Sequence, residues 1–426
     1  MKVLIVGNGG REHALALKIK ASPLVETIYV AQGNAGTLAI AENIAIKIDD
    51  LEALSNFVIE KEIGLVVAGS ELPLSLGLEN VIREKSNKIG RRVHFFGPSK
   101  ECALLEASKD FSKSMMKDLG IPTARYESFT DYDEACEYFS SFGESSIPVI
   151  KVDGLASGKG VFLPISIEEG KEILKSIMKD GIFGKSGNKV IIEERLQGEE
   201  LSLMAFSDGK DIALLPVSKD HKRLLDGDLG PNTGGMGAFA PHPNYSNKQI
   251  GDFAKITIEP IIKEMAKRGT PYKGILYAGL MIAKDGVKVL EYNCRFGDPE
   301  TQVLMELFEG DIVPTLIACS EGNLSSNLPK WKKAFVAITV VMASGGYPEG
   351  KIVPVPLKKD ELKEEDCVKV IHAGTSLIDG ILYATGGRAL CVTSCNEELA
   401  KAEKSVYERI KAITFQDVQY RKDIAK

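Results

Sequence analysis

VLIVGNGGREHAL (Val3–Leu15) opens the chain and decides the fold class of its first domain. Val3–Val6 is a short apolar run, Gly7–Gly10 is a glycine-rich turn, and Arg11–Ala21 has the pattern of a helix. A strand, a glycine loop and a helix in this order point backbone N–H groups and a helix N-terminus at a phosphate. The stretch therefore predicts a βα unit with a phosphate-binding loop, although the same spacing also fits a tight turn without a ligand.

The first hundred residues continue this alternation of strands and helices. Three further strands and two helices are expected, at Thr27–Val30, Gly64–Ala68, Val93–Phe96, Asp50–Lys61 and Leu78–Ser86. Alternating βα units build a parallel sheet with helices on both faces. Residues 1–105 are therefore predicted to form a doubly wound N-terminal domain.

The remainder of the chain divides into two further regions, 106–325 and 326–426. One helix is expected over Lys100–Leu119, at the junction with the first domain. The middle region holds a long irregular loop, Gly227–Pro243, and a hairpin, Gly274–Asn293, whose turn carries an Asp-Gly signal. The last region is rich in short strands and closes with a helix, which predicts a small mixed α/β domain.

Composition places the chain among ordinary globular proteins. Of 426 residues, 44% are apolar and 26% are charged. The 53 basic and 59 acidic residues give a net charge of −6, which disfavours nucleic acid or an anionic membrane as a partner. The seven cysteines are scattered without a CxxC pair, as expected for free thiols in a reducing compartment. The first apolar run is too short for a signal peptide, so we expect a cytoplasmic protein, and a monomer.

The opening loop does not complete a dinucleotide site. Such a site has an acidic residue about twenty positions further on, at the end of the second strand, to bind ribose hydroxyls. Here that strand runs into Ala31 and Gln32, and no carboxylate is present. The third position of the glycine fingerprint is Glu12 instead of Gly or Ala. NAD is therefore disfavoured, whereas a different phosphate ligand remains possible.

A second glycine-rich segment, KVDGLASGKGV (Lys151–Val161), differs from a P-loop. Three residues separate Gly154 from Gly158 where a P-loop has four, and Gly160 stands where Ser or Thr would hold magnesium. A flexible glycine loop between two strands can instead close over the phosphates of ATP. The alternative is a surface hairpin with a solvated lysine.

Two further segments carry dense charge at the ends of strands. VIIEERLQGEELS (Val190–Ser202) fits either an extended hinge that binds adenine and ribose or a solvent-exposed acidic hairpin. In VLEYNCRFGDPETQ (Val289–Gln302), Glu291 and Asn293 lie two apart on a strand and share one side. Oxygen ligands of this kind suit Mg²⁺, and Arg295 follows on the same face, while the alternative is a structural ion network.

The order of these motifs resembles the ATP-grasp superfamily. GNGGREHAL at Gly7, DHKR at Asp220, GPNTGGMGAF at Gly230 and NCRFGDPETQ at Asn293 are similar to the phosphoribosylamine–glycine ligase family within it. The similarity extends to HAGT at His372 and covers essentially the whole chain. It implies an ATP-grasp domain over 106–325, with a lid at about 122–195, and a single-function enzyme.

The resemblance also implies a reaction in purine biosynthesis. The carboxylate of glycine attacks the γ-phosphate of ATP to give glycyl phosphate and ADP. The amine of 5-phosphoribosylamine then displaces phosphate and forms glycinamide ribonucleotide. Joining anions in this way requires positioning and positive charge, here from Mg²⁺ (or Mn²⁺) and from Lys and Arg side chains.

The same resemblance assigns roles to individual residues. The residues implied to bind ATP are Lys109, Lys151, Ser157, Gly158, Lys159, Gly160, Glu193, Leu196 and Glu200. Glu291 and Asn293 are implied to bind the metal, Arg295 to stabilise the acyl phosphate, and Asp220 to bind the ammonium group of glycine. The substrate pocket is implied to comprise Asn232, Thr233, Gly234 and Gly235. The loop Asn8, Gly9, Gly10, Arg11 and Glu12 is expected to hold the 5-phosphate of phosphoribosylamine.

The chain departs from the family pattern in places, and two rival functions remain. GSELPL at Gly69 lacks the common Gly-Pro-Glu string, although Glu71 remains, and Asp110 follows Lys109 where Ala is common. The strand before Glu291 carries no metal carboxylate. Another ATP-grasp carboxylate ligase, such as a carboxylase, lacks the DHKR and GPNTGGMG strings in this form. A regulatory nucleotide-binding module would be expected to have a degraded metal site.

Overall fold

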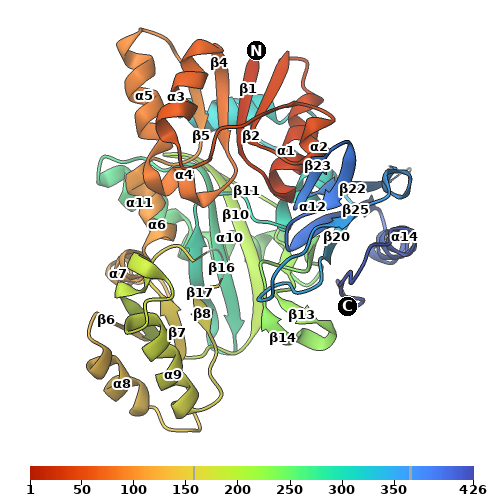
Figure 1. Ribbon diagram of the computed structural model, residues 1–426. Coiled ribbons are helices and arrows are strands. Elements are labelled where there is room, and N and C mark those ends of the chain that lie inside the picture. The colour runs from red at the N-terminus through yellow and green to blue at the C-terminus, as the bar shows by residue number, and fades with distance from the viewer. Residues whose placement is uncertain (157–158, 364–366) are drawn as a thin grey trace.

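The N-terminal part of the chain forms a five-stranded parallel sheet, sheet A, as predicted (Figure 1). The computed structural model describes residues 1–156, 159–363 and 367–426. In the order β3-β2-β1-β4-β5, the strands are β3 (Glu42–Ile44), β2 (Thr27–Gln32), β1 (Lys2–Gly7), β4 (Ile63–Ala68) and β5 (His94–Phe96). The helices are α1 (Gly10–Lys20), α2 (Ala35–Leu38), α3 (Leu51–Glu60), α4 (Glu71–Leu76) and α5 (Leu78–Lys88).

Both faces of sheet A are buried, which explains why β1 is apolar at every central position. Val3 and Ile5 belong to the core cluster that also holds residues of α1, whereas Leu4 and Val6 belong to the cluster that holds residues of α3 and α5. Strand β3 was not expected, because it is only three residues long and buries only Ile44. The end of β1 lies beside the end of β4.

The single helix expected over Lys100–Leu119 is two helices, α6 (Lys100–Ala107) and α7 (Lys109–Asp118). Ser108 between them has an extended backbone, and its hydroxyl accepts the N–H of Phe111 as an N-cap. Asp153 fixes the break, because its carboxylate accepts the Ser108 hydroxyl and the N–H of Asp110. The expectation of one helix was wrong because this partner lies far away in the sequence.

A small antiparallel sheet, sheet C, carries the glycine-rich segment and has a core of its own. Its strands, in the order β6-β9-β7-β8, are β6 (Tyr126–Phe129), β9 (Val190–Glu193), β7 (Val149–Val152) and β8 (Val161–Phe162). Helices α8 (Tyr132–Ser140) and α9 (Ile167–Met178) pack on it at the bottom of Figure 1. Sheet C therefore lies at one end of the molecule, far from sheet A.

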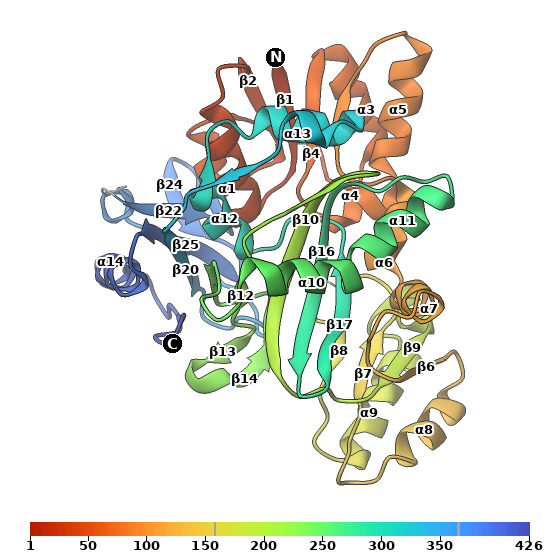
Figure 2. The ribbon, with the colours of Figure 1, turned by 180° about the vertical axis from the view of Figure 1, so that it is seen from behind.

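A larger antiparallel sheet, sheet B, occupies the middle of the molecule. Its strands are β11 (Ile212–Leu214), β10 (Glu199–Asp208), β16 (Lys273–Ala283) and β17 (Gly286–Asn293), and the predicted hairpin is β16–β17. Helices α10 (Asn247–Thr257) and α11 (Glu259–Lys267) cover its back (Figure 2). Helices α12 (Glu300–Leu307) and α13 (Val313–Glu321) follow the hairpin and pack toward sheet A.

The last part of the chain forms sheet D, which it shares with the middle region. The order is β12 (Lys219–Asp220), β15 (Gly237–Ala240), β20 (Val336–Ala343), β25 (Arg388–Asn396) and β22 (Val368–His372), with α14 (Leu399–Lys411) against it. The remaining short strands are β13 (Arg223–Leu225), β14 (Leu229–Asn232), β18 (Phe308–Glu309), β19 (Lys330–Trp331), β21 (Val355–Pro356), β23 (Thr375–Ile378) and β24 (Ile381–Ala384). Two strands that precede β16 in sequence thus complete the C-terminal sheet.

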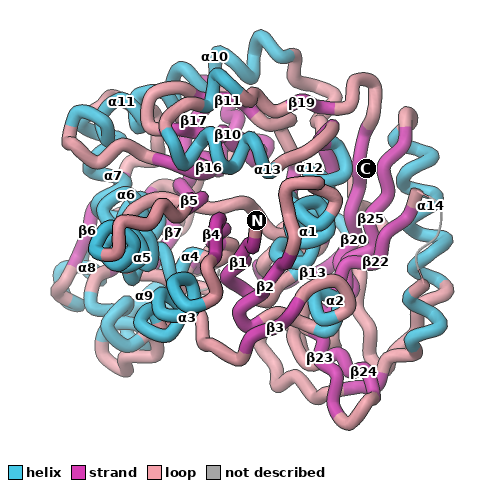
Figure 3. The backbone as a smooth tube through the Cα atoms, turned by 90° about the horizontal axis from the view of Figure 1, so that it is seen from above, coloured by secondary structure: helices cyan, strands magenta, loops and turns pink. Residues whose placement is uncertain are grey.

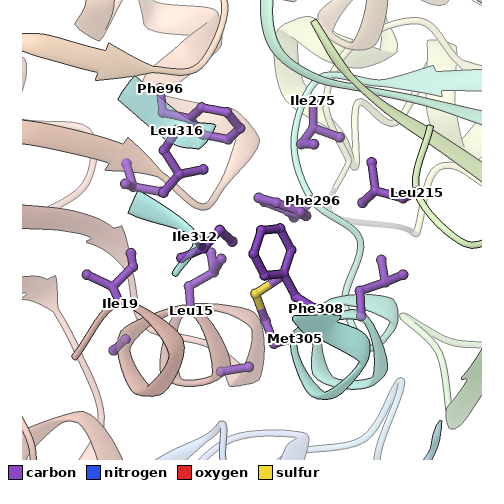
Figure 4. Close-up of a cluster of buried hydrophobic side chains, with 14 of the residues drawn as sticks. Leu15, Ile19, Phe96, Leu215, Ile275, Phe296, Met305, Phe308, Ile312 and Leu316 are labelled. Carbon is purple, nitrogen blue, oxygen red and sulfur yellow. The ribbon is translucent and has the colours of Figure 1, made fainter. Parts of the chain in front are cut away.

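One hydrophobic cluster joins the N-terminal unit to the centre of the molecule (Figure 4). Leu15 on α1 and Phe96 at the end of β5 belong to it, together with Phe296 and Phe308. The ring of Phe296 lies 5.9 Å from that of Phe96, centre to centre. Seen from above, α1 lies beside α12 (Figure 3). This packing fixes the segment after β17, which carries Arg295.

Among the residues described, no helix has both the length and the apolar character needed to span a bilayer.

Candidate active site

A cavity of about 860 Å³ lies where sheets B and C, the N-terminal unit and the C-terminal sheet meet. Its walls bring together segments from nearly the whole chain. The predicted site residues that line it are Arg11, Lys109, Lys151, Gly160, Glu193, Leu196, Glu200, Asp220, Asn232, Thr233, Gly234, Glu291, Asn293 and Arg295. Of the other predicted residues that the structure describes, Asn8, Gly9, Gly10, Glu12, Lys159 and Gly235 are not among the lining residues. Ser157 and Gly158 lie outside the described residues.

Glu193, at the end of β9, lies between two buried lysines. The Nζ of Lys151 on β7 lies 2.5 Å from its Oε1, and the Nζ of Lys113 on α7 lies 2.6 Å from its Oε2. Burial alone would raise the pKa of Glu193, but the two ammonium groups outweigh burial and lower the pKa. The ionised carboxylate therefore forms an ion pair with each of the two lysines. The expected role of Glu193 in binding ATP stays a prediction.

Lys109 begins α7 and turns toward the loop that follows β7. Its Nζ donates to the carbonyl of Val152 at 2.9 Å and to that of Gly154 at 3.3 Å. Burial lowers the pKa of Lys109, and nearby Glu291 partly opposes the shift. The neighbouring Asp110 does not act on Lys109, because its carboxylate is bound to Ser128 and Lys189.

Glu291 and Asn293 line the cavity from β17, and each is paired with a residue of β16 that brings no carboxylate. Burial would raise the pKa of Glu291, but Lys222, Lys151 and Lys109 outweigh it and lower the pKa. The Oδ1 of Asn293 accepts a hydrogen bond from Arg295 at 3.1 Å.

An ionised carboxylate and an amide oxygen fit a hard cation that takes its other ligands from phosphate and water. Within the described residues, no group of three or more His, Cys, Asp or Glu side chains is arranged to hold a metal ion. A cation here would therefore need non-protein ligands.

Arg295 is fixed by two carboxylates from different helices. Its Nη2 lies 3.1 Å from Glu106 of α6, and its Nε lies 3.4 Å from Glu71 of α4. Burial raises the pKa of Glu106 to about 7 in spite of Arg295. In Glu71, Arg295 and Arg11 outweigh burial and lower the pKa. The guanidinium is therefore held in one orientation at the cavity wall.

Asp220, on β12, is a buried carboxylate whose Oδ1 has no hydrogen-bond partner. Burial and the neighbouring Glu300 raise its pKa well above the usual range. Glu300 accepts hydrogen bonds from the hydroxyls of Ser202 (2.9 Å) and Tyr277 (2.6 Å). Lys222 stands nearby, and Glu200, Glu291 and Asp220 raise its pKa in spite of burial. This end of the cavity combines acceptors for an ammonium group with one strong cation.

The loop after β14 closes this end of the cavity. The hydroxyl of Thr233 donates to the carbonyl of Lys222 at 2.8 Å and accepts the N–H of Gly235 at 3.0 Å. A side chain at Gly235 (φ +110°) would meet Asp220 and Pro299, so this glycine supports the pocket without lining it. Arg388 of sheet D donates to the carbonyl of Gly234 at 2.7 Å.

The side chain of Glu12 fills the space inside the opening loop. The carboxylate of Glu12 accepts the N–H of Gly9 at 2.6 Å and lies 2.7 Å from the Nε of Arg11. It fills the space between the ends of β1 and β4, since a Cβ on Gly7 or Gly69 would lie within 2.6 Å or 2.0 Å of it. This is the crevice where a doubly wound sheet binds a nucleotide. A second anion bound there would lie close to the Glu12 carboxylate, which is paired with Arg11.

The expected phosphate cradle at Asn8–Glu12 stays a prediction, and the structure limits the groups that it could use. The N–H of Gly9 is already used by Glu12, and Gly10 is packed against Gln302. Only Arg11 reaches the cavity, and its Nη1 donates to the carbonyl of Phe296 at 3.0 Å.

Several charged residues of the cavity were missed at the sequence level. Lys113 could have been predicted from the sequence, because it follows Lys109 by one helical turn and so lies on the same face. Asp298 and Arg388 form an ion pair of 3.3 Å, but they are far apart in the chain. No local pattern connects such residues. The missed residues include Glu71, Glu106, Lys113, Lys222, Asp298, Glu300 and Arg388.

Comparison with known families matches almost the whole chain to one family. The N domain, the ATP-grasp (A) domain and the C domain of phosphoribosylglycinamide synthetase match residues 1–106, 107–301 and 337–426. The phosphoribosylamine–glycine ligase of Brucella melitensis is 44% identical over 100% of this chain and 97% of its own length. The trifunctional purine biosynthetic protein adenosine-3 of Gallus gallus is also 44% identical, and the chain spans 42% of its length.

Solved structures agree with this assignment. A crystal structure of phosphoribosylamine–glycine ligase from Thermotoga maritima has a TM-score of 0.82 and 33% identity, with 100% of both chains covered. A biotin carboxylase of Campylobacter jejuni shares the fold at a TM-score of 0.72 but has only 14% identity, covering 99% of this chain and 93% of its own. The chain therefore belongs to the phosphoribosylglycinamide synthetase family of the ATP-grasp fold.

Proposed function

We propose that the chain is an ATP-dependent ligase that joins glycine to 5-phosphoribosylamine. Its products would be glycinamide ribonucleotide, ADP and phosphate, with glycyl phosphate as the intermediate. The observation that carries this proposal is a single cavity with a lysine-rich wall at one end and the Asp220–Lys222 pocket at the other. Family membership supports the reaction.

The first end of the cavity is proposed to bind ATP. Lys109 and Lys151 would supply positive charge for the phosphates, and Gly160, which lines the same cavity, would belong to the lid over them. Leu196 and Glu200 line the wall after β9, where adenine and ribose would lie. The lid residues Ser157, Gly158 and Lys159 remain part of this proposal.

Mg²⁺ is proposed to be held by Glu291 and Asn293 together with phosphate oxygens. Bound there, it would offset the charge between the phosphates and the incoming carboxylate. Mn²⁺ prefers similar oxygen ligands and is proposed as a substitute.

The second end is proposed to bind glycine and the acyl phosphate that forms from it. Asp220 would take the ammonium group, because a cation beside it favours the ionised carboxylate that burial and Glu300 disfavour. Arg295, held by Glu71 and Glu106, presents a fixed guanidinium to the phosphate oxygens. A dry site matters here, because glycyl phosphate would otherwise hydrolyse.

Phosphoribosylamine is proposed to enter beside Arg11 and the loop formed by Asn232, Thr233 and Gly234. Asn8, Gly9 and Gly10 are proposed to face its 5-phosphate, although the N–H of Gly9 is bound by Glu12. We further propose that the protein acts in the cytoplasm as a monomer.

The test is an ADP-release assay in which each component is omitted in turn. Release should require glycine, phosphoribosylamine formed in situ, and Mg²⁺ together. Bicarbonate in place of glycine is the control, because a biotin carboxylase shares the fold. Full ADP release with bicarbonate would contradict the proposal.

A further inference from the structure

Lys113 is an unusually buried ammonium group next to the proposed ATP site. Its side chain is 2% exposed, and its Nζ lies 2.6 Å from Glu193. The same Nζ donates to the hydroxyl of Thr123 at 2.7 Å, and that hydroxyl donates to the carbonyl of Val289 on β17. The ring of Tyr126 lies 5.6 Å away. Lys113 is therefore held in place, and burial lowers its pKa to about 8.

Glu193 connects Lys113 to a second lysine. Its other oxygen lies 2.5 Å from Lys151, which also donates to the carbonyl of Leu290 at 3.2 Å. One carboxylate thus serves two cations, and the three side chains carry a net charge of +1. With Lys113 neutral, the carboxylate would cancel the charge of Lys151. The loss of one charge has a strong effect on its neighbours in a buried site, where water screens charges weakly.

We propose that Lys113 is a positioning residue for the ATP phosphates. It takes up much of the negative charge of Glu193 and so leaves the positive charge of Lys151 available to the cavity. Lys113 acts through Glu193 and makes no phosphate contact of its own. This inference rests on the proposed function in one respect only, namely that the cavity binds ATP.

The first experiment measures ATP binding by calorimetry without glycine or phosphoribosylamine. Lys113→Met should raise the Kd for ATP about tenfold, because the surplus charge at Lys151 is lost. Lys117→Met is the matched control, since Lys117 lies on the same helix with an exposed side chain. An unchanged Kd in Lys113→Met would overturn the inference. Lys113→Gln, which keeps a donor for Thr123, gives the same test if the methionine variant does not fold.

A double-mutant cycle tests the route of the effect. In a Glu193→Gln background the negative charge is gone, so Lys113→Met should change the Kd for ATP less than threefold. A full tenfold effect in that background would overturn the inference, because it would mean that Lys113 acts on the phosphates directly. Melting curves of each variant confirm that it is folded.

The outcome is separable from that of the proposed function. If ADP release by the unmodified protein did not depend on glycine, the proposed ligase reaction would fail. The ATP-binding measurements on the Lys113 variants would still decide the role of Lys113.

Discussion

Glu291 lies among cations and is proposed to bind a metal ion instead of forming a structural ion pair. Lys222, Lys151 and Lys109 lower its pKa, yet no salt bridge within the described residues ties its carboxylate to any one of them. Glu291→Gln should therefore abolish turnover and leave the fold intact, since the amide keeps the shape but cannot hold a cation as a carboxylate does. ADP release measures the first effect, and a melting curve measures the second. Near-normal rates would place the metal site elsewhere.

Arg295 is held from two sides, and a lysine cannot reproduce this arrangement. Glu106 and Glu71 contact different nitrogens of its guanidinium, and a further nitrogen donates to the carbonyl of Phe296. Arg295→Lys should lower kcat by about 10- to 100-fold, because one ammonium group cannot replace the planar fork. Steady-state kinetics check this prediction, with Arg92→Lys as an exposed control. A change in the KM for ATP alone would contradict it.

For single residues, the sequence allowed prediction where the contacts that set a side chain's position lie close by in the chain. The two-residue period of a strand correctly predicted that Glu291 and Asn293 share one side, and both line the cavity. The same period places Cys294 on the opposite side of the strand, and the structure buries it in the core. Glu106 and Arg388 were missed, because their contacts depend on how distant segments pack. The expected cradle at Asn8–Glu12 stays a prediction; the sequence pattern did not reveal that Glu12 binds the N–H of Gly9 in its own loop.

The elements themselves were mostly predictable from apolar patterns and turn signals. The parallel sheet and the β16–β17 hairpin follow from such local rules. The break between α6 and α7 does not, because the groups that fix it belong to Asp153 on another strand. Its consequence is functional, since the break places Lys109 at the start of a helix beside the cavity.

The loop after β14 depends on one arginine from a different sheet. Nη1 of Arg388 donates at 2.7 Å to both the Gly234 and Asp298 carbonyls, and Nη2 lies 3.3 Å from the Asp298 carboxylate. Arg388→Gln should raise the KM for phosphoribosylamine about tenfold and the KM for ATP much less, because the loop loses its anchor while the lysine wall is untouched. Initial-rate kinetics with each substrate varied test this. Equal changes in both values would contradict a local effect.

At the scale of the whole molecule, two histidines make the free energy of unfolding depend on pH. Burial lowers the pKa of His372 to about 4, and burial together with His372 lowers that of His13 to about 3. These rings, 5.7 Å apart, join the N-terminal unit to sheet D. The unfolded chain binds protons below about pH 6.5 while the folded protein does not. Each histidine therefore contributes stability that is lost as the pH falls from about 6.5 toward its folded pKa.

His372→Gln should weaken this dependence. Between pH 6 and pH 5, the free energy of unfolding should fall less steeply than in the unmodified protein, by about 1 kcal/mol per pH unit. Urea unfolding at several pH values provides the measurement. Parallel pH profiles for the two proteins would show that this ring is not the source of the acid sensitivity.

Sheet D also limits which segments of this protein can be replaced by those of a relative. Its strands β12 and β15 come from the middle of the chain, and β15 pairs directly with β20. A chimera that exchanged residues 337–426 alone would join a foreign sheet to the native β15 edge. The exchange has to include residues 219–240 as well, and with them the pocket around Asp220. The C-terminal sheet and the substrate pocket are therefore expected to be inherited as one block.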